Sequence, residues 1–158
     1  MPRSNPPEIA VLPAGQETVF TSTAVSYADA RGILQLLPGT AREMARVVGV
    51  PYEEARLLSD PAYNALLGGT YIARMVADYR GSYALALTAY NAGPGRVADW
   101  IERNGDPRDS VEEAVDWIEF IPFDETRNYV QRTLENLQVY RSRLGFPELE
   151  IERDLVGR

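Results

Sequence analysis

The sequence predicts an all-α fold, and three observations support this. From Thr40 onward, apolar residues recur at spacings of three and four, the period of an amphipathic helix. Prolines, capping residues and glycines bound these segments as helix ends require. No alternating strand pattern longer than a few residues competes, and no internal repeat is visible. A chain of 158 residues, 45% of them hydrophobic, is long enough for one globular core.

The first expected helix has the sequence "TAREMARVV" and stops at Gly49. Its spacing places Met44, Val47 and Val48 on one apolar face. That face predicts one side of the core. Because glycine accepts the left-handed conformation, Gly49 is a suitable helix terminator.

A longer helix is expected between Asp60 and Gly81. Asp60 is suited to the N-cap, Pro61 to the first helical position, and Gly81 to the termination. Gly68 and Gly69 lie inside this helix, where each glycine costs about 1 kcal/mol relative to alanine. We therefore expect a neighbouring element to approach the helix closely at these glycines.

Three further helices are expected in the second half of the chain. The stretch "GSYALALTAYNAG" predicts a short buried helix, and Ser110 with Glu113 forms a capping box before the next one. The last helix covers residues 124–144. Its apolar stripe consists of Val130, Leu134, Leu137, Tyr140 and Leu144.

The chain divides into three expected regions. Residues 1–13 are rich in proline and predict an irregular N-terminal segment. Residues 14–145 contain the helical patterns and form the expected domain. Residues 146–158 carry four acids and two arginines with little apolar content, so we expect a charged C-terminal tail.

Composition removes many kinds of chemistry. The chain has no cysteine and no histidine, which excludes thiolate or imidazole metal sites and Ser-His-Asp triads. All 16 basic residues are arginine, so Schiff-base chemistry and a P-loop lysine are absent as well. Carboxylates, hydroxyls and amides remain, and we expect neither a metal nor another cofactor. A net charge of -7, with no arginine-dense stripe, argues against nucleic-acid binding.

The sequence also carries no membrane or export signal. No run reaches the eighteen apolar residues typical of a membrane span, and the N-terminus lacks the apolar region of a signal peptide. The absence of cysteine fits either redox compartment. We expect a soluble monomer, although the sequence does not determine the oligomeric state.

Four stretches could carry chemistry: "GQETVF" at 15–20, "AVSYADARGILQLLPGTA" at 24–41, "TAYNAGPGRV" at 88–97 and "IPFDETRNYV" at 121–130. Each has a purely structural interpretation. Glu17 is typical of a solvated surface group, and "GILQLLP" fits a helix turn whose leucines face a core. Gly93 fits a left-handed helix end, and Pro94 fits the start of the next helix. The acids near Glu125 fit a helix N-terminus, where negative charge is favoured.

Together, the order and spacing of these stretches resemble the catalytic domain of the soluble lytic murein transglycosylases, a goose-lysozyme-like group. The resemblance covers about residues 15–144. The blocks Ala89–Gly95 and Ile121–Val130 match the family pattern without a gap. The resemblance implies a lysozyme-like helical domain that cleaves the MurNAc-GlcNAc β-1,4 bond of peptidoglycan glycan strands and leaves 1,6-anhydro-MurNAc ends. It also implies a periplasmic or cell-envelope location.

The family pattern also assigns roles to individual residues. It implies that Glu17 is the catalytic acid and base, with Tyr90 close to it. Glu125 would contact an N-acetyl group of the substrate. The implied substrate-binding residues are Ser26, Gln35, Leu37, Ala89, Tyr90, Asn91 and Glu125.

General chemistry agrees with a catalytic glutamate. Glycosidic cleavage needs a proton donor for the leaving oxygen, and a glutamic acid serves near neutral pH if an apolar pocket raises its pKa toward about 6. Ordinary glycosidases use a second carboxylate. The family is thought to use one, since the substrate's N-acetyl group stabilises the sugar cation and its C6 hydroxyl is the nucleophile. An internal nucleophile gains from high effective molarity.

The sequence departs from the family pattern around the catalytic block. Pro13 and Gly15 interrupt the apolar helix that usually leads into the glutamate, and Thr18 replaces serine. Asp29 stands where glycine is usual, and Leu34 and Leu37 replace methionines. Two alternatives of the same fold therefore stay open: a non-catalytic peptidoglycan-binding or structural domain, and a goose-type lysozyme hydrolase that leaves reducing ends. A third is a protein-interaction module without a glycan role.

Overall fold

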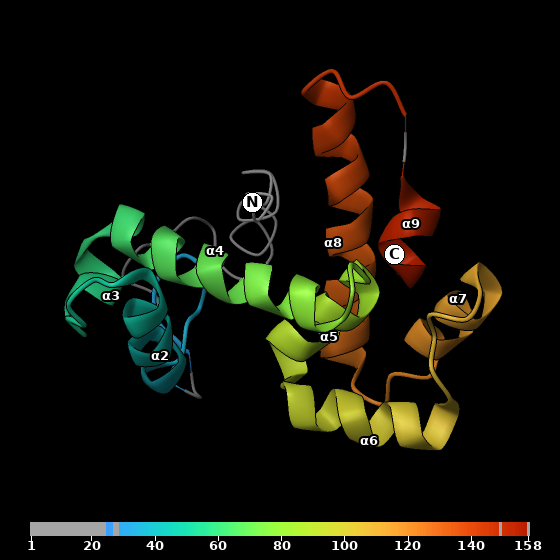
Figure 1. Ribbon diagram of the computed structural model, residues 1–158, viewed down its shortest axis with the longest axis horizontal. Coiled ribbons are helices and arrows are strands. Elements are labelled where there is room, and N and C mark those ends of the chain that lie inside the picture. Colours follow the sequence, from blue (N-terminus) through green and yellow to red (C-terminus); the bar gives the residue numbers. More distant parts are fainter. Residues whose placement is uncertain (1–24, 27–28, 149, 158) are drawn as a thin grey trace. The chain divides into compact units, whose positions relative to one another are not determined.

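The computed structural model describes residues 25–26, 29–148 and 150–157, in two compact units, Met1–Ala73 and Arg74–Arg158. The regular elements of the described residues are helices, accompanied by isolated bridges from Arg31 to Val25 and Leu36. This confirms the all-α prediction. The helices, labelled in Figure 1, are α2 (Pro38–Val48), α3 (Arg56–Ser59), α4 (Pro61–Asp78), α5 (Tyr83–Ala92), α6 (Pro94–Asn104), α7 (Val111–Glu119), α8 (Asp124–Arg143) and α9 (Ile151–Val156).

The helix ends follow the local signals. Asp60 Oδ1 accepts a hydrogen bond of 3.0 Å from the backbone N–H of Tyr63, and α4 begins at Pro61. Ser110 Oγ accepts one of 3.1 Å from the backbone N–H of Glu113, which caps α7. Gly49 ends α2 in the left-handed conformation, with φ 75° and ψ 29°. These predicted ends are confirmed because each depends on groups within a few residues.

One helix face in the first unit was predicted incorrectly. Val47 is 63% exposed, whereas Met44 is fully buried. The buried stripe of α2 runs through Ala41, Met44 and Ala45, with Val48 partly buried against the same core. Small alanines at helical spacing therefore face the core, and the larger valine faces solvent. The core of this unit consists of Leu36, Ala41, Met44, Ala45, Leu57, Tyr63 and Leu67.

Gly68 of α4 confirms the expected close approach. A Cβ atom built there would lie 2.5 Å from Leu34 Cδ1 and 2.8 Å from Leu34 Cβ. Leu34 belongs to the loop that precedes α2 and is itself buried. The glycine thus lets this loop lie directly on α4.

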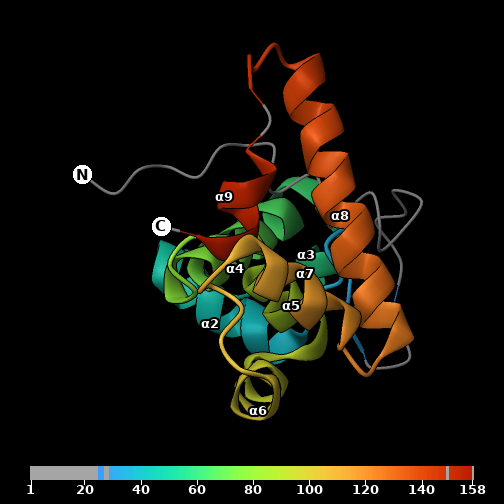
Figure 2. The ribbon, with the colours of Figure 1, turned by 90° about the vertical axis from the view of Figure 1, so that its right-hand side faces the viewer.

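Helix α5 forms the core of the second unit. Residues 84–89 are all buried, and α5 contacts α6, α8 and α9. The predicted short buried helix is confirmed. Ser82 caps α5 through its Oγ, which accepts from the backbone N–H of Leu85, and the same hydroxyl donates to Leu155 O at 2.7 Å. Figures 1 and 2 show α9 beside α8 within this unit.

The C-terminal region differs from the expected tail. Residues Ile151–Val156 form α9, in which Asp154, Leu155 and Val156 are buried. Arg141 of α8 meets Asp154 in a buried ion pair, with 2.5 Å between Nη1 and Oδ2. One acid of this charged region, Asp154, is therefore part of an internal ion pair. The domain bounds of 14 and 145 remain predictions.

Because of this ion pair, the buried face of α8 differs from the predicted apolar stripe. Leu144 is 62% exposed, and Arg141 takes the inward position near the end of the helix. Burial acts to lower the pKa of Arg141, but hydrogen bonds and charge from Asp154 outweigh it, so the pKa is raised overall. The inner face of α8 therefore continues through a paired arginine, which hydropathy alone does not predict.

Candidate functional site

The candidate site residues fall in separate parts of the chain. Ser26, Gln35 and Leu37 lie in the first unit, whereas Ala89, Tyr90, Asn91 and Glu125 lie in the second. Glu17, Pro13, Gly15 and the whole of residues 1–13 lie outside the described residues. The two groups are therefore described in turn.

The described residues between Val25 and Leu36 form a bridged turn. Arg31 and Leu36 exchange backbone hydrogen bonds of 3.0 Å, and Ser26 N–H donates to Ala30 O at 2.9 Å. Ser26 Oγ accepts from the backbone N–H of Ala30 at 3.0 Å, so its hydroxyl has a structural contact inside the turn. Leu34 and Leu36 are buried, as the structural interpretation of "GILQLLP" predicted, but the helix turn is wrong, because these backbone groups pair across a loop.

A buried amide on α4 holds this loop in place. Asn64 has no exposed surface, and its Oδ1 accepts from the backbone N–H of Leu34 at 2.9 Å. Its Nδ2 donates to Arg31 O at 2.9 Å and to Leu57 O at 3.1 Å. Asn64 thus satisfies three backbone groups that α4 itself does not pair. The sequence analysis missed it, although an asparagine between apolar helix positions was a usable signal.

Three residues of the loop have positive φ. Asp29 has φ 64°, Gly32 φ 75° and Gln35 φ 47°. Asp is among the residues that tolerate this region, so Asp29 supplies the conformation that the usual glycine provides. Its carboxylate also accepts from Arg31 Nη2 at 2.9 Å, and this hydrogen bond is the main reason that the pKa of Arg31 is raised.

Gln35 and Leu37 occupy different environments in this loop. Gln35 is half-buried, and its Nε2 donates to Gly32 O at 2.9 Å, which fixes the side chain against its own turn. Leu37 precedes α2 and is 45% exposed, so its apolar side chain is open to solvent. A held amide and an exposed apolar side chain are suitable groups for a carbohydrate, which offers both hydroxyls and C–H faces.

In the second unit, the candidate residues lie at the C-terminal end of α5. Ala89 is fully buried, and its carbonyl accepts from the backbone N–H of Gly93 at 2.9 Å. Tyr90 and Asn91 follow it and are half-buried. The tight apolar packing of the preceding helix therefore sets where these two polar side chains emerge.

Gly93 ends α5 in a different conformation from the one predicted. Its φ is 94°, which is positive as expected, but its ψ of 146° lies outside the left-handed helical region. The chain is thereby extended at Gly93 and enters α6 at once, since Pro94 is the first residue of α6. The predicted start at Pro94 is confirmed.

One hydrogen bond joins the two matching blocks of this unit. Thr126 Oγ1 donates to Asn91 Oδ1 at 2.7 Å, which ties the end of α5 to the first turn of α8. Thr126 is buried, and the preceding Glu125 is exposed. Arg127 braces the same turn, since its Nη1 donates to Ile121 O at 2.9 Å. The structure thus places Asn91 beside the turn that carries Glu125; Thr126 was missed as a support.

The described residues offer neither a membrane-spanning helix nor a metal site. No helix among them is both long and apolar enough to cross a membrane. They also contain no group of three or more carboxylate, histidine or cysteine side chains arranged to hold a metal ion.

In the second unit, the motif "AYNAGPG" ends a buried helix, and its Asn91 accepts a hydrogen bond from the first turn of α8, in "IPFDETR". The fold belongs to the lysozyme-like helical class. The chain is a member of the Transglycosylase SLT domain family, whose model matches residues 1–112. The model of the soluble lytic transglycosylase helical domain matches residues 120–148.

Individual relatives agree with this family. The chain is 33% identical over 141 residues to the soluble lytic murein transglycosylase of Escherichia coli K12. This match covers 89% of the present chain and 21% of the relative. The 70 kDa soluble lytic transglycosylase from Escherichia coli matches with a TM-score of 0.82 and 31% identity, over 97% of this chain and 24% of the other.

The lytic transglycosylase Slt from Pseudomonas aeruginosa matches with a TM-score of 0.78 and 36% identity. This match covers 90% of the present chain and 22% of the other, which was solved as an inactive mutant with glutamine in place of a glutamate. The chain thus spans about a fifth of the length of these relatives.

Proposed function

We propose that this chain is a lytic transglycosylase domain that cleaves the MurNAc-GlcNAc β-1,4 bond of peptidoglycan without water. The observation that carries the proposal is the Asn91–Thr126 hydrogen bond, which joins the two blocks that match the family without a gap. Membership of the transglycosylase family supports it further. The polar groups beside this bond then belong to a glycan groove.

In this mechanism Glu17 acts twice. As an acid it gives its proton to the leaving oxygen as the C1–O4 bond breaks, and the substrate's N-acetyl group stabilises the positive sugar. As a base it then takes the proton of the C6 hydroxyl while the new C1–O6 bond forms, which yields the 1,6-anhydro ring. No water enters, because the internal hydroxyl has the higher effective concentration.

The remaining candidate residues position the glycan. Gln35, held by its bond to Gly32 O, and Ser26 offer hydrogen bonds from the loop, and the exposed Leu37 offers apolar contact. Tyr90 and Asn91 act at the end of α5, and Glu125 contacts an N-acetyl group. The buried Ala89 contributes by placing its neighbours.

The relatives also support a proposed substrate and a proposed location for the domain. Peptidoglycan glycan strands are the proposed partner, and the periplasm or cell envelope is the proposed location, following the murein transglycosylases to which the chain is similar. We propose that the domain acts as a monomer.

The decisive experiment compares Glu17→Gln with wild type on purified peptidoglycan. General acid–base catalysis contributes about 10²–10⁴-fold, so the loss of the sole acid and base should reach or exceed the upper end. Glu8→Gln removes a carboxylate from the same N-terminal stretch, outside the matching blocks, and serves as the control. Sedimentation with insoluble peptidoglycan should show that Glu17→Gln still binds.

Mass spectrometry of the released muropeptides identifies the reaction. The wild-type products should end in 1,6-anhydro-MurNAc, one water lighter than hydrolysis products. Reducing ends alone would identify a hydrolase, and binding without products would identify a non-catalytic domain. Either result, or full activity in Glu17→Gln, would show the proposed mechanism to be wrong.

A further inference from the structure

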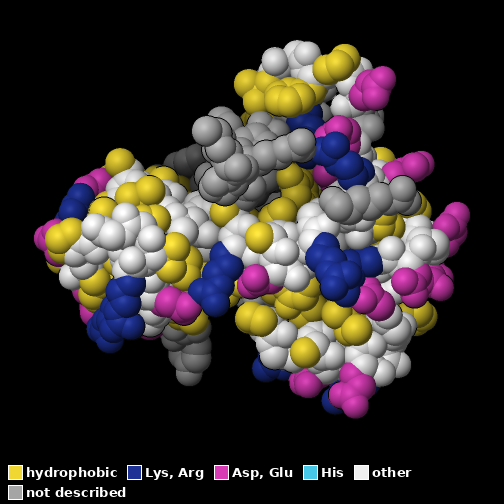
Figure 3. Space-filling model, viewed as in Figure 1, with side chains coloured by type: hydrophobic (Ala, Val, Ile, Leu, Met, Phe, Trp, Pro, Cys, Tyr) yellow, Lys and Arg dark blue, Asp and Glu magenta, His cyan; other side chains and the backbone are white. Residues whose placement is uncertain are grey.

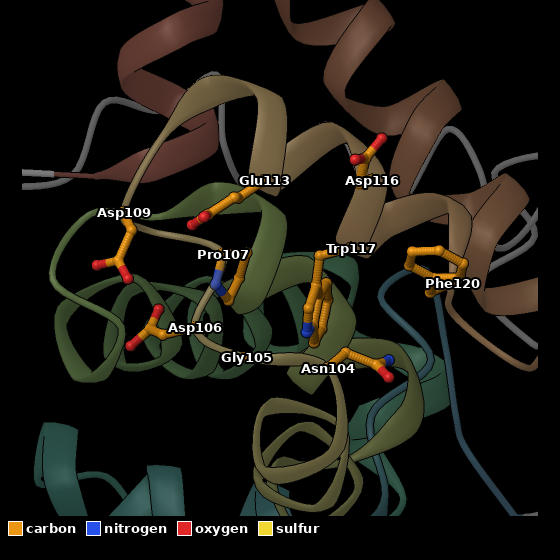
Figure 4. A pocket seen from close by; sticks show the side chains of 9 residues that line it. All are labelled: Asn104, Gly105, Asp106, Pro107, Asp109, Glu113, Asp116, Trp117 and Phe120. Carbon is orange, nitrogen blue, oxygen red and sulfur yellow. The ribbon is translucent and has the colours of Figure 1, made fainter.

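A pocket lies in the second unit, between the end of α6 and α7. It encloses about 280 Å³ and contains none of the residues proposed to bind glycan. That volume is at the lower end for ligand pockets, so it suits one side chain and its neighbouring amide. Figure 4 shows its lining, which consists of Asn104, Gly105, Asp106, Pro107, Asp109, Glu113, Asp116, Trp117 and Phe120.

The lining carries four carboxylates and no basic side chain. Asp106 is neutralised by Arg108, whose Nη2 lies 2.5 Å from Asp106 Oδ2, and this hydrogen bond is the main reason that the pKa of Asp106 is lowered. Arg108 also attracts Asp109. Glu113 and Asp116 form no ion pair in the described part of the chain. Figure 3 shows acidic side chains gathered over α7, so the pocket favours a cation.

A buried hydrogen-bond donor faces the same pocket. Trp117 is only 3% exposed, and its Nε1 has no hydrogen-bond partner among the described residues. Figure 4 shows its ring directed from α7 toward the loop at Gly105. A buried indole N–H usually has a partner. The unpaired Nε1 therefore indicates a ligand with an acceptor oxygen, in addition to the cation that the carboxylates favour.

The side chains that line the pocket determine which cation it can bind. The described residues contain no group of carboxylates close enough to hold a metal ion. Dispersed carboxylates suit a compact ammonium on a flexible stem, which carries three rotatable donors, better than the rigid fork of a guanidinium. Pro107, which Figure 4 shows between Asp109 and Trp117, offers apolar contact for such a stem.

We propose that this pocket binds a lysine-type side chain of a peptide. Its ammonium lies between Asp109 and Glu113, its methylene stem passes Pro107, and the amide carbonyl of the same residue accepts from Trp117 Nε1. The site is independent of the proposed glycan cleavage, so either can fail without the other.

The test uses the two tryptophans of the chain, which give two indole N–H signals in a ¹H–¹⁵N NMR spectrum. The probe is Nα-acetyl-lysine-methylamide, and Trp117→Phe identifies the Trp117 signal. We expect this signal to move saturably with the probe. The norleucine analogue, which lacks the ammonium, and hexylamine, which lacks the amide, should each move it much less. Calcium chloride should leave it unchanged.

Charge variants test the position of the ammonium. Asp109→Asn and Glu113→Gln should each weaken probe binding about threefold, and the double variant about tenfold. Glu112→Gln is the matched control, because Glu112 lies in the same exposed first turn of α7 but does not line the pocket. A static Trp117 signal, an equal response to norleucine or calcium, or equal weakening by Glu112→Gln would overturn the proposal.

Discussion

The two compact units hold their candidate site residues by different means. In the first unit, a loop with positive φ at Asp29 and Gln35 is fixed by hydrogen bonds from the buried side chain of Asn64. In the second, the polar residues Tyr90 and Asn91 lie in the last turn of a helix whose residues 84–89 are all apolar or small and buried.

This difference has a physical cause. A loop pairs only some of its own backbone groups, so a buried loop needs partners from elsewhere for the rest, and each unpaired group costs about 1–3 kcal/mol. A helix pairs its backbone internally, so apolar packing is enough to place its end. The first unit should therefore be sensitive to the loss of a polar side chain, and the second to changes in packing, buried charge and backbone conformation.

The largest expected effect concerns the buried ion pair of the second unit. Arg141→Met leaves Asp154 buried without its charged partner, and breaking such a pair costs about 3–5 kcal/mol. Urea unfolding measures the change in the free energy of unfolding. Arg143→Met is the control, since Arg143 is exposed on the same helix. Equal, small effects of the two variants would show that the second unit does not depend on this pair.

The next effect concerns the brace of the first unit. Asn64→Leu leaves Leu34 N–H and Leu57 C=O without the Asn64 amide and removes one of the two donors to Arg31 C=O, so we expect a loss of about 3 kcal/mol. Amide hydrogen exchange should show faster exchange at Leu34. Asn128→Leu places the same side chain at an exposed helix position and should have little effect. Unchanged protection of Leu34 in Asn64→Leu would contradict the comparison.

A smaller effect is expected where α5 meets α6. Gly93→Ala forces a Cβ onto φ 94° and ψ 146°, a region used almost only by glycine, at about 2 kcal/mol. No atom lies within 4 Å of that Cβ, so the effect is one of backbone conformation. Gly95→Ala, which also meets open space, should leave the melting temperature unchanged or slightly raised. Equal melting temperatures for both variants would refute this explanation.

The smallest expected effect is a dependence of stability on pH, which we expect at the cap of α4, Asp60, but not at the cap of α7, Ser110. A hydrogen bond from Arg56, followed by one from Tyr63 N–H, lowers the pKa of Asp60. A carboxyl group whose pKa is lower in the folded state stabilises the fold at pH values above its unfolded pKa of about 3.9. This stabilisation is lost as the pH falls through the folded pKa. Ser110, the cap of α7, does not titrate.

Thermal unfolding of Asp60→Asn and Ser110→Ala across this pH range tests the difference. The gap between Asp60→Asn and wild type should close as the pH falls below about 3.9. The effect of Ser110→Ala, about 1 kcal/mol, should stay constant. A gap for Asp60→Asn that does not depend on pH would show that its charge plays no part in the cap.

The two units also show which structural features could be predicted from the sequence and which could not. It predicted helix starts at Pro61 and Pro94 and the end at Gly49, and the motif blocks led to the family that the comparisons confirm. It misjudged Val47 and Leu144, because hydropathy at helical spacing does not show how wide the covered face is. Glu17 and the roles of the other candidate residues remain predictions.

The sequence by itself determined where the helices begin and end and which family the chain belongs to, because caps, glycines, prolines and short motifs act over a few neighbouring residues. Tertiary structure alone decided that Asn64 pairs with Arg31, Leu34 and Leu57, and that Arg141 pairs with Asp154. These partners lie 7 to 33 residues apart in the chain, and each polar group is stable in the interior only because the fold brings its partner to it.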